Sequence, residues 1–204
     1  MKHIFFYITL VFIACISNIN AQGTDLRWLD KINSPINSTT DGAWQFISNS
    51  INVVGFGAPL SIFIVGVTTH NKDLKLKSYK TGISLLLAGT LSTALKITIQ
   101  RPRPFATYPN IIYKKGEAGS YSFPSGHTNF AFATATSLSL AFPKWYIVVP
   151  AYAYAAAVGY SRMYLGVHYP SDVLVGALIG IGSSFLTFHA QKWIHKNKET
   201  KSPE

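Results

Sequence analysis

The sequence predicts an all-α fold, a polytopic membrane helical bundle with about five spans after a signal peptide. Hydrophobic residues make up 48% of the 204-residue chain, and charged residues make up only 13%. The apolar residues also gather in stretches that approach the ~20 residues that a helix needs to cross a bilayer. This composition is unusual for a soluble protein, and the length allows one domain with a sizeable apolar interior.

Residues 1–21 have the pattern of a secretory signal peptide, in which a lysine precedes an apolar run. Cleavage after Ala21 would place the start of the mature chain outside the cytoplasm. Ile19 is larger than the residue preferred at the third position before a cleavage site, so an uncleaved first span is the alternative. The single cysteine, Cys15, lies in this segment and leaves a lipoprotein signal as a third interpretation.

Residues 22–50 are predicted to form an interfacial segment on the outer face. Leu26, Trp28, Leu29 and Ile32 form a short amphipathic pattern, which favours a helix lying on the membrane surface. Turn-forming residues between 33 and 42 separate this helix from the first span.

Residues 51–191 form the predicted membrane domain, and residues 192–204 form a basic cytoplasmic tail. Gly, Ala, Ser and Thr are frequent in the apolar stretches, which suits close packing of helices. The spans are predicted at residues 51–69, 79–99, 126–142, 145–161 and 172–190.

Lysines set the predicted orientation. They gather between the first two spans and again in the tail, and basic segments remain in the cytoplasm. A chain whose first span starts outside therefore has residues 100–125 and 162–171 on the outer face. The predicted location is the bacterial inner membrane, with the active site facing the periplasm. The net charge of +10 does not indicate nucleic-acid binding, because the cations cluster at segment ends instead of alternating with aromatic residues.

Three polar clusters fall on the predicted outer side. The first is Lys96 followed by Arg101-Pro102-Arg103-Pro104, the second is Pro124-Ser125-Gly126-His127, and the third is Ser161-Arg162 followed by His168 and Asp172. In residue types, order and spacing the three clusters resemble the motifs of the type 2 phosphatidic acid phosphatase (PAP2) family, and the resemblance extends over about residues 40–190. It implies a membrane lipid phosphatase with these residues in its active site.

The residue types suit phosphoryl transfer, which depends mainly on stabilising the charge of the phosphoryl oxygens. Lys96, Arg103 and Arg162 are predicted to form a phosphate cradle, since Arg provides paired donors and Lys a point charge. Arg101 either joins this cradle or lies outside it. The alternative for the cations is an ordinary snorkelling or loop position, which the rarity of ionisable groups within spans disfavours.

Ser125 and Gly126 open a predicted helix, so free backbone N–H groups, the Ser125 hydroxyl and the space beside Gly126 are all expected to serve the same anion. A simple turn with a helix cap is the alternative, and both can hold.

His168 is the predicted nucleophile, which forms a phosphohistidine that water then hydrolyses. His127 is the predicted general acid and then the general base. Asp172 is expected to hold the proton on the other nitrogen of His168, although a charge complementing the helix dipole is its alternative role.

No metal and no cofactor are predicted, because the two histidines and the one acid at this face already have roles. The predicted partners are a lipid phosphate or diphosphate substrate and the membrane, and the sequence gives no oligomeric state. A vanadate-dependent haloperoxidase, a non-specific acid phosphatase and a non-catalytic lipid-binding protein are the alternatives. Residues 105–122, including Lys114, Lys115 and Glu117, are expected to set substrate preference.

Overall fold

A computed structural model describes residues 21–33, 35 and 38–199. These residues form helices and connecting loops, which confirms the predicted all-α class. The predicted signal peptide, apart from Ala21, lies outside the described residues. The helices are α2 (Ala21–Ile32), α3 (Ser38–Thr68), α4 (Lys72–Ile99), α5 (Pro104–Thr107), α6 (Gly126–Ala141), α7 (Trp145–Tyr164) and α8 (Pro170–Glu199).

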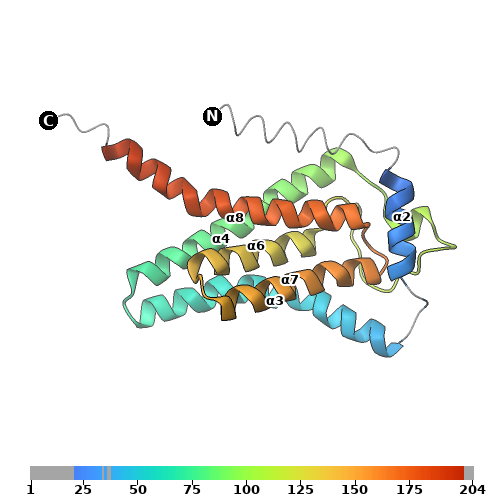
Figure 1. Ribbon diagram of the computed structural model, residues 1–204, viewed down its shortest axis with the longest axis horizontal. Coiled ribbons are helices and arrows are strands. Elements are labelled where there is room, and N and C mark those ends of the chain that lie inside the picture. Colours follow the sequence, from blue (N-terminus) through green and yellow to red (C-terminus); the bar gives the residue numbers. More distant parts are fainter. Residues whose placement is uncertain (1–20, 34, 36–37, 200–204) are drawn as a thin grey trace.

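The long helices α3, α4, α6, α7 and α8 run side by side as a bundle, and α2 lies across one end of it (Figure 1). Helix α6 has neighbours on all sides, because it packs against α8, α7, α4 and α3. The short α3–α4 and α6–α7 connections turn at the far end of the bundle. The long segment between α4 and α6 and the α7–α8 loop therefore meet at the end that carries α2 (Figure 1).

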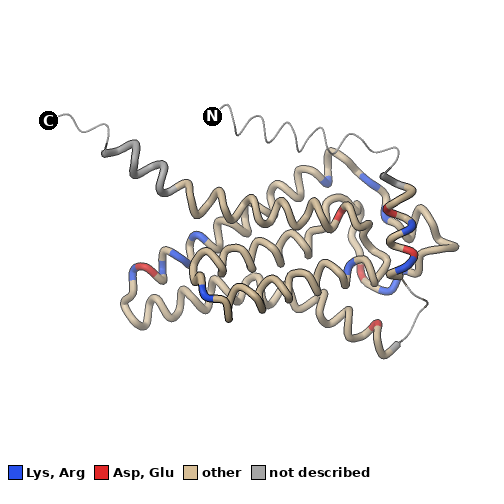
Figure 2. The backbone as a smooth tube through the Cα atoms, viewed as in Figure 1, with Lys and Arg blue, Asp and Glu red and all other residues tan. Residues whose placement is uncertain are grey.

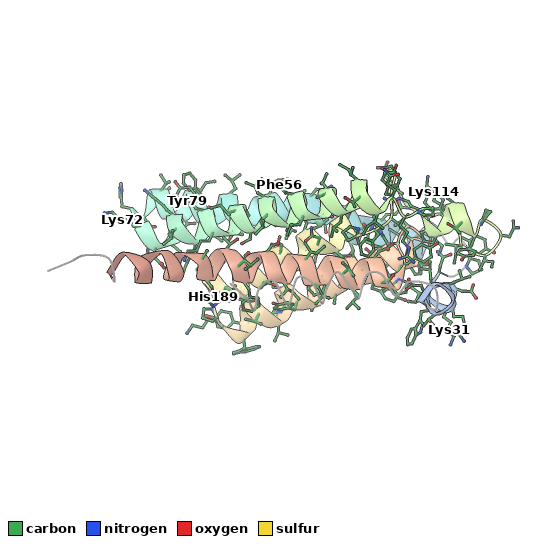
Figure 3. The ribbon with its side chains drawn as sticks, turned by 90° about the horizontal axis from the view of Figure 1, so that it is seen from above. Lys31, Phe56, Lys72, Tyr79, Lys114 and His189 are labelled. Atoms are coloured by element: carbon green, nitrogen blue, oxygen red, sulfur yellow. The ribbon has the colours of Figure 1, made fainter. Side chains whose placement is uncertain are left out.

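The polarity of the bundle is inverted relative to a water-soluble protein. Thr136, Ser137 and Ser184 are fully buried at its centre, whereas Val53 is 77% exposed and Leu86 is 73% exposed. Figure 3 shows apolar side chains such as Phe56 pointing outward along the middle of the bundle. Small polar residues between helices and large apolar residues around them are typical of a protein whose outer surface contacts lipid.

The charged residues lie away from the apolar middle of the bundle. Figure 2 shows lysines, arginines and acids at the two ends of the described bundle, with an uncharged stretch between them. Three helical segments within the described residues are long and apolar enough to cross a membrane: Thr39–Thr68, Lys72–Thr107 and Pro170–Ala190. Helix α6 has only 16 residues, about 24 Å of rise, and it is enclosed by the other helices.

Close packing between α6 and α8 depends on two glycines. A Cβ atom at Gly176 would lie 2.6 Å from the Ser125 carbonyl oxygen, and one at Gly180 would lie 2.3 Å from the Asn129 carbonyl oxygen. Both contacts are impossible for a larger residue unless the backbones separate. The glycines therefore bring the start of α8 against the start of α6, where the second and third sequence clusters meet.

The predicted boundaries differ from the structure mainly at α3. This helix begins at Ser38, inside the segment expected to be turn, and continues through residue 51 without a break. The apolar pattern starts later than the helix because the first turns of α3 are polar and pack against the loops at the α2 end. The predicted amphipathic helix is present as α2, with Leu29 fully buried and Trp28 63% exposed.

Candidate active site

The second cluster ends a loop and begins α6, as the sequence predicts. Ser125 is the N-cap residue, and its backbone N–H donates to the Asp172 carbonyl at 3.0 Å. A Cβ atom at Gly126 would meet no atom within 4 Å, so open space adjoins this helix start. The first-turn N–H groups of α6 have no partner within the helix and can donate to an anion there.

The Ser125 hydroxyl and His127 occupy different environments. The hydroxyl is fully buried and shares a 2.8 Å hydrogen bond with the Thr128 hydroxyl, so the structure already gives it a partner. His127 is half-buried in the first turn of α6. It lies within electrostatic reach of Arg162, His168 and the other predicted cradle cations, which places it at the same site.

The third cluster places His168 just before α8 and Asp172 in its first turn. Both side chains are buried, with exposed fractions of 2% and 0%. Nδ1 of His168 lies 3.5 Å from Oδ2 of Asp172, which is longer than a well-formed hydrogen bond. Catalytic hydrogen bonds are often long without substrate and shorten when substrate binds. Asp172 is held in place by the Tyr169 backbone N–H, which donates to Oδ2 at 2.9 Å.

The neighbours of His168 indicate its tautomer. Nε2 lies 3.3 Å from Nη1 of Arg103, and a guanidinium group can only donate. Nε2 must therefore accept, which leaves the proton on Nδ1, facing Asp172. Nε2 is the ring nitrogen on the cation side of the site, and it keeps a lone pair in this tautomer.

Burial lowers the pKa of His168 to about 4. The charge of Asp172 acts in the opposite direction, while Arg162 and Arg103 add to the lowering. An ordinary histidine has a pKa of about 6.5. The ring is consequently neutral at pH 7, which is the state that a nitrogen nucleophile requires.

The three predicted cradle cations share an unusual property: none forms an ion pair with a carboxylate among the described residues. Arg103 is 6% exposed and Arg162 is 3% exposed, and Lys96 is partly buried. Buried charges are strongly unfavourable unless they are paired, and charge-assisted bonds to an anion are the usual compensation. The three cations lie close enough to interact electrostatically, so they form one positively charged site.

Neutral oxygens hold these cations in position. Lys96 Nζ donates to the Tyr121 carbonyl at 3.0 Å. Arg103 donates to the Gly119 and Val167 carbonyls at 2.8 Å and 2.7 Å. The side chains are thus oriented by the loops while their charge remains uncompensated.

Arg162 is oriented by α3 and by the long loop. It donates to the Ser48 hydroxyl at 2.6 Å and to the Glu117 carbonyl at 3.1 Å. Its Nε is buried and has no hydrogen-bond partner within the described residues. An unused donor on a buried guanidinium is an available contact for an anion.

Arg101 does not share this property. Its Nη1 donates to Asp172 Oδ1 at 2.7 Å, and its Nη2 donates to Asp25 Oδ2 at 2.9 Å. The guanidinium also lies over the Tyr169 ring, 3.9 Å from the centroid. Of the two roles left open by the sequence, the structure places Arg101 outside the cradle, as the partner of two acids.

A polar pocket of about 340 Å³ adjoins Arg162. Gln45 and Asn49 of α3 form one side, and residues 114–117 form the other. These loop residues belong to the segment expected to set substrate preference. Lys115 is buried here, with Nζ 3.3 Å from Asp41 Oδ1.

An apolar groove of about 730 Å³ lies between α3, α4 and α6. Its lining includes Ala94 and Ile97, which flank Lys96 in α4, and Phe130, which lies one helical turn beyond His127 in α6. The groove therefore leads from the lipid-facing surface toward the charged site.

No group of three or more His, Cys, Asp or Glu side chains within the described residues could hold a metal ion. The prediction that the reaction needs no metal remains a prediction.

Sequence reasoning missed two residues at this site, Asp25 and Ser48. They contact Arg101 and Arg162 across 76 and 114 positions of sequence. The helical spacing of Asp25 and Leu29 gives them one shared face of α2, but this pattern alone does not identify the arginine that the acid meets.

Comparison with known proteins agrees with the geometry. The PAP2 superfamily matches residues 79–196, which include all three clusters. Undecaprenyl-diphosphatase BcrC of Bacillus subtilis is 32% identical over 152 residues, covering 74% of this chain and 75% of that protein. An undecaprenyl-diphosphatase of Sulfolobus acidocaldarius is 36% identical over 105 residues, covering 52% of this chain and 50% of that protein. The chain spans about half the length of several curated relatives that it matches.

A solved structure is similar over nearly the whole chain. It is that of the first transmembrane PAP2 type phosphatidylglycerolphosphate phosphatase from Bacillus subtilis. The TM-score is 0.66 with 26% sequence identity, and the similarity covers 93% of this chain and 94% of that one. With a family match across more than half of its length, and with the clusters assembled at one end of a membrane bundle, this chain belongs to the PAP2 superfamily.

Proposed function

We propose that the protein is a metal-independent membrane phosphatase that hydrolyses a lipid phosphate or diphosphate through a phosphohistidine intermediate. The observation that carries this proposal is a group of three cations beside a neutral histidine: the buried Arg103 and Arg162 and the partly buried Lys96, none with a carboxylate partner among the described residues. Such a group favours an anion with several oxygens, and a phosphoryl group meets that requirement.

The chemical steps follow from the two ring nitrogens of His168. Nε2 attacks phosphorus, a P–N bond forms, and the bond to the leaving oxygen breaks while His127 gives that oxygen a proton. A water molecule then attacks the phosphohistidine, His127 takes a proton from it, and the P–N bond breaks to release phosphate. Asp172 keeps the Nδ1 proton in place and stabilises the positive charge that develops on the ring.

Lys96, Arg103, Arg162 and the α6 N-terminus stabilise the phosphoryl oxygens during both steps. Their donors are already oriented by loop carbonyls and by Ser48, so little reorganisation accompanies the reaction.

A lipid substrate fits two cavities: the pocket that Arg162 lines and the groove that runs along α4 as far as Ile97, the residue after Lys96. The polar pocket beside Arg162 suits a head group, and the apolar groove between α3, α4 and α6 suits a hydrocarbon chain. The lysines near the α3–α4 turn lie at the opposite end from the site (Figure 3). The positive-inside rule places that end in the cytoplasm, and the site then faces the periplasm from a bacterial inner membrane.

Phosphate release by the detergent-purified protein tests this function. The assay contains EDTA and compares polyprenyl diphosphate, lipid A, phosphatidylglycerol phosphate and phosphatidic acid with a soluble aryl phosphate. We expect release from at least one lipid, faster than from the aryl phosphate, and loss of release in His168→Gln. The matched control is His189→Gln, which changes an exposed histidine of α8 away from the site and should leave the rate unchanged.

Two results would overturn the proposal. Activity that disappears with EDTA and returns with a divalent cation would contradict metal independence. Wild-type rates in His168→Gln would remove the nucleophile. A protein that instead oxidises bromide in the presence of vanadate would be a haloperoxidase on the same scaffold.

A further inference from the structure

We propose that helix α2 positions the catalytic aspartate, with Asp25 acting on Asp172 through Arg101. This inference rests on the proposed function, because it concerns the orientation of His168 by Asp172. It gives α2 a task in catalysis.

Arg101 bridges the two acids, Asp172 and Asp25. The Arg101 guanidinium uses one nitrogen for Asp172 at 2.7 Å and the other for Asp25 at 2.9 Å. All three side chains are largely buried, and that of Asp172 is fully so. Charged hydrogen bonds in such surroundings fix geometry strongly, since breaking one leaves an unpaired charge away from water.

Asp25 also holds the backbone that carries Asp172. Oδ1 of Asp25 accepts from the Ser171 backbone N–H at 3.1 Å, and Oδ2 accepts from the Ser171 hydroxyl. These bonds satisfy a free donor in the first turn of α8 with an acid from a different helix. Asp25 therefore constrains both the partner of Asp172 and the helix start on which Asp172 stands.

The contacts of both carboxylate oxygens restrict rotation of the Asp172 side chain. Its Oδ2 must serve the Tyr169 N–H at 2.9 Å and also face Nδ1 of His168 at 3.5 Å. Arg101 occupies the other oxygen, Oδ1, so the carboxylate cannot rotate without losing a charged bond. The bridge thus keeps Oδ2 directed at the histidine.

Helix α2 is anchored to the loops around the site, so Asp25 can transmit this constraint. Leu29, one turn after Asp25, is fully buried against Ile112 and Tyr169. Asn33, one further turn along, donates to the Tyr113 and Tyr164 carbonyls at 3.0 Å and 2.8 Å. One face of α2 is therefore fixed to the loops that surround the site.

The test is a double-mutant cycle measured with the lipid substrate that the wild-type protein hydrolyses. Asp25→Asn removes the charge and keeps the shape, and Arg101→Lys keeps the charge and loses the two-sided bridge. We expect kcat to fall about 10-fold in Asp25→Asn and about 100-fold in Arg101→Lys, with KM changed less than about twofold. Asp30→Asn is the matched control, because Asp30 lies on the exposed face of α2, and it should leave kcat unchanged.

The cycle separates positioning from a general structural effect. In an Asp172→Asn background, which retains residual activity, Asp25→Asn should change kcat by less than about twofold, because its route of action is already absent. An equal loss in both backgrounds, or no loss in the wild-type background, would overturn the inference. Asp25→Glu, which restores the carboxylate, should recover most of the lost rate.

Should Asp25→Asn fail to fold, Ser171→Ala provides the same cycle. It removes one hydroxyl from the network and leaves both ion pairs, and the expected loss in kcat is about threefold. A wild-type protein that releases no phosphate from any lipid would instead contradict the proposed function, so the two failures are distinguishable.

Discussion

Two groups of buried or partly buried cations lie at the same end of this bundle, and they differ in their partners. Arg101 and Lys115 each pair with buried acids, Arg101 with Asp25 and Asp172 and Lys115 with Asp41. Lys96, Arg103 and Arg162 donate only to neutral oxygens or, for Arg103, to a histidine ring. The paired cations are compensated by acids within the fold, whereas the other three have no carboxylate partner among the described residues, and we expect an anion to bind them.

Arg103→Gln should have the largest effect on activity among the cation variants. The substitution removes a charge that stabilises the phosphoryl oxygens, and we expect kcat/KM to fall about 10³-fold. The thermal midpoint in detergent should fall less than in Lys115→Gln, because the loss of an uncompensated buried charge offsets the loss of the hydrogen bonds to the Gly119 and Val167 carbonyls. A larger fall than in Lys115→Gln would mean that Arg103 is compensated after all.

Lys115→Gln should show the reverse pattern. It leaves Asp41 buried without its cation, and we expect the free energy of unfolding to fall by about 3 kcal/mol. Activity of the folded fraction should change less than about 10-fold, because Lys115 is not in the cradle. Denaturation followed by tryptophan fluorescence measures the first quantity, and lipid phosphatase assays below the midpoint measure the second.

Inorganic phosphate or vanadate should stabilise the protein by binding to the unpaired cations. At a concentration of about 100 times Kd the expected gain is roughly 2.7 kcal/mol, visible as a rise in the thermal midpoint. The rise should be absent in Arg103→Gln and present in Lys115→Gln. Equal rises in both variants would show that the anion binds elsewhere.

The unpaired cations should also shape the pH dependence. Burial, with Arg162 and Arg103, lowers the pKa of His168 to about 4, so kcat/KM should fall as the pH drops through about 4 and not near 6.5. The unfolded chain binds this proton at higher pH, so stability should also decline between about pH 6.5 and 4. In Arg103→Gln the acid limb should move upward, since one of the charges that lower this pKa is gone.

Lys77→Gln is the smallest expected effect. Lys77 lies near the opposite end, in an i,i+4 pair with Asp73, whose side chain is 66% exposed. Helix pairs of this kind contribute about 0.3–0.5 kcal/mol, and the contact of Lys77 Nζ with the Phe142 ring adds a similarly small amount, so the midpoint should fall only slightly and the rate should not change.

The sequence was sufficient where the signal is local. Apolar stretches, prolines and cap residues mark the C-terminal ends of α4, α6 and α7 and the start of α8. These four boundaries coincide with the prediction or lie within three residues of it. The three clusters also carry their own helix context, so the placement of His168 before α8 and Asp172 within its first turn could be anticipated.

The remaining features depend on contacts between distant segments. The motif assigns Arg103 to the cradle but leaves the role of Arg101 open, and only the fold brings Asp25 to Arg101. The polar first turns of α3 carry no membrane signal, although they supply Ser48 to Arg162. The number of membrane-crossing helices also does not follow from apolar stretches alone, because the short α6 is enclosed by other helices.

Trapping the phosphorylated intermediate distinguishes covalent catalysis at His168 from direct attack of water on phosphorus. The wild-type protein would be mixed with lipid substrate labelled in the transferred phosphoryl group, stopped within milliseconds in alkali, and digested for mass spectrometry. We expect the label on the peptide that contains His168, at a stoichiometry approaching one, and none in His168→Gln. Steady turnover with no labelled histidine, or with label on His127, would contradict the mechanism.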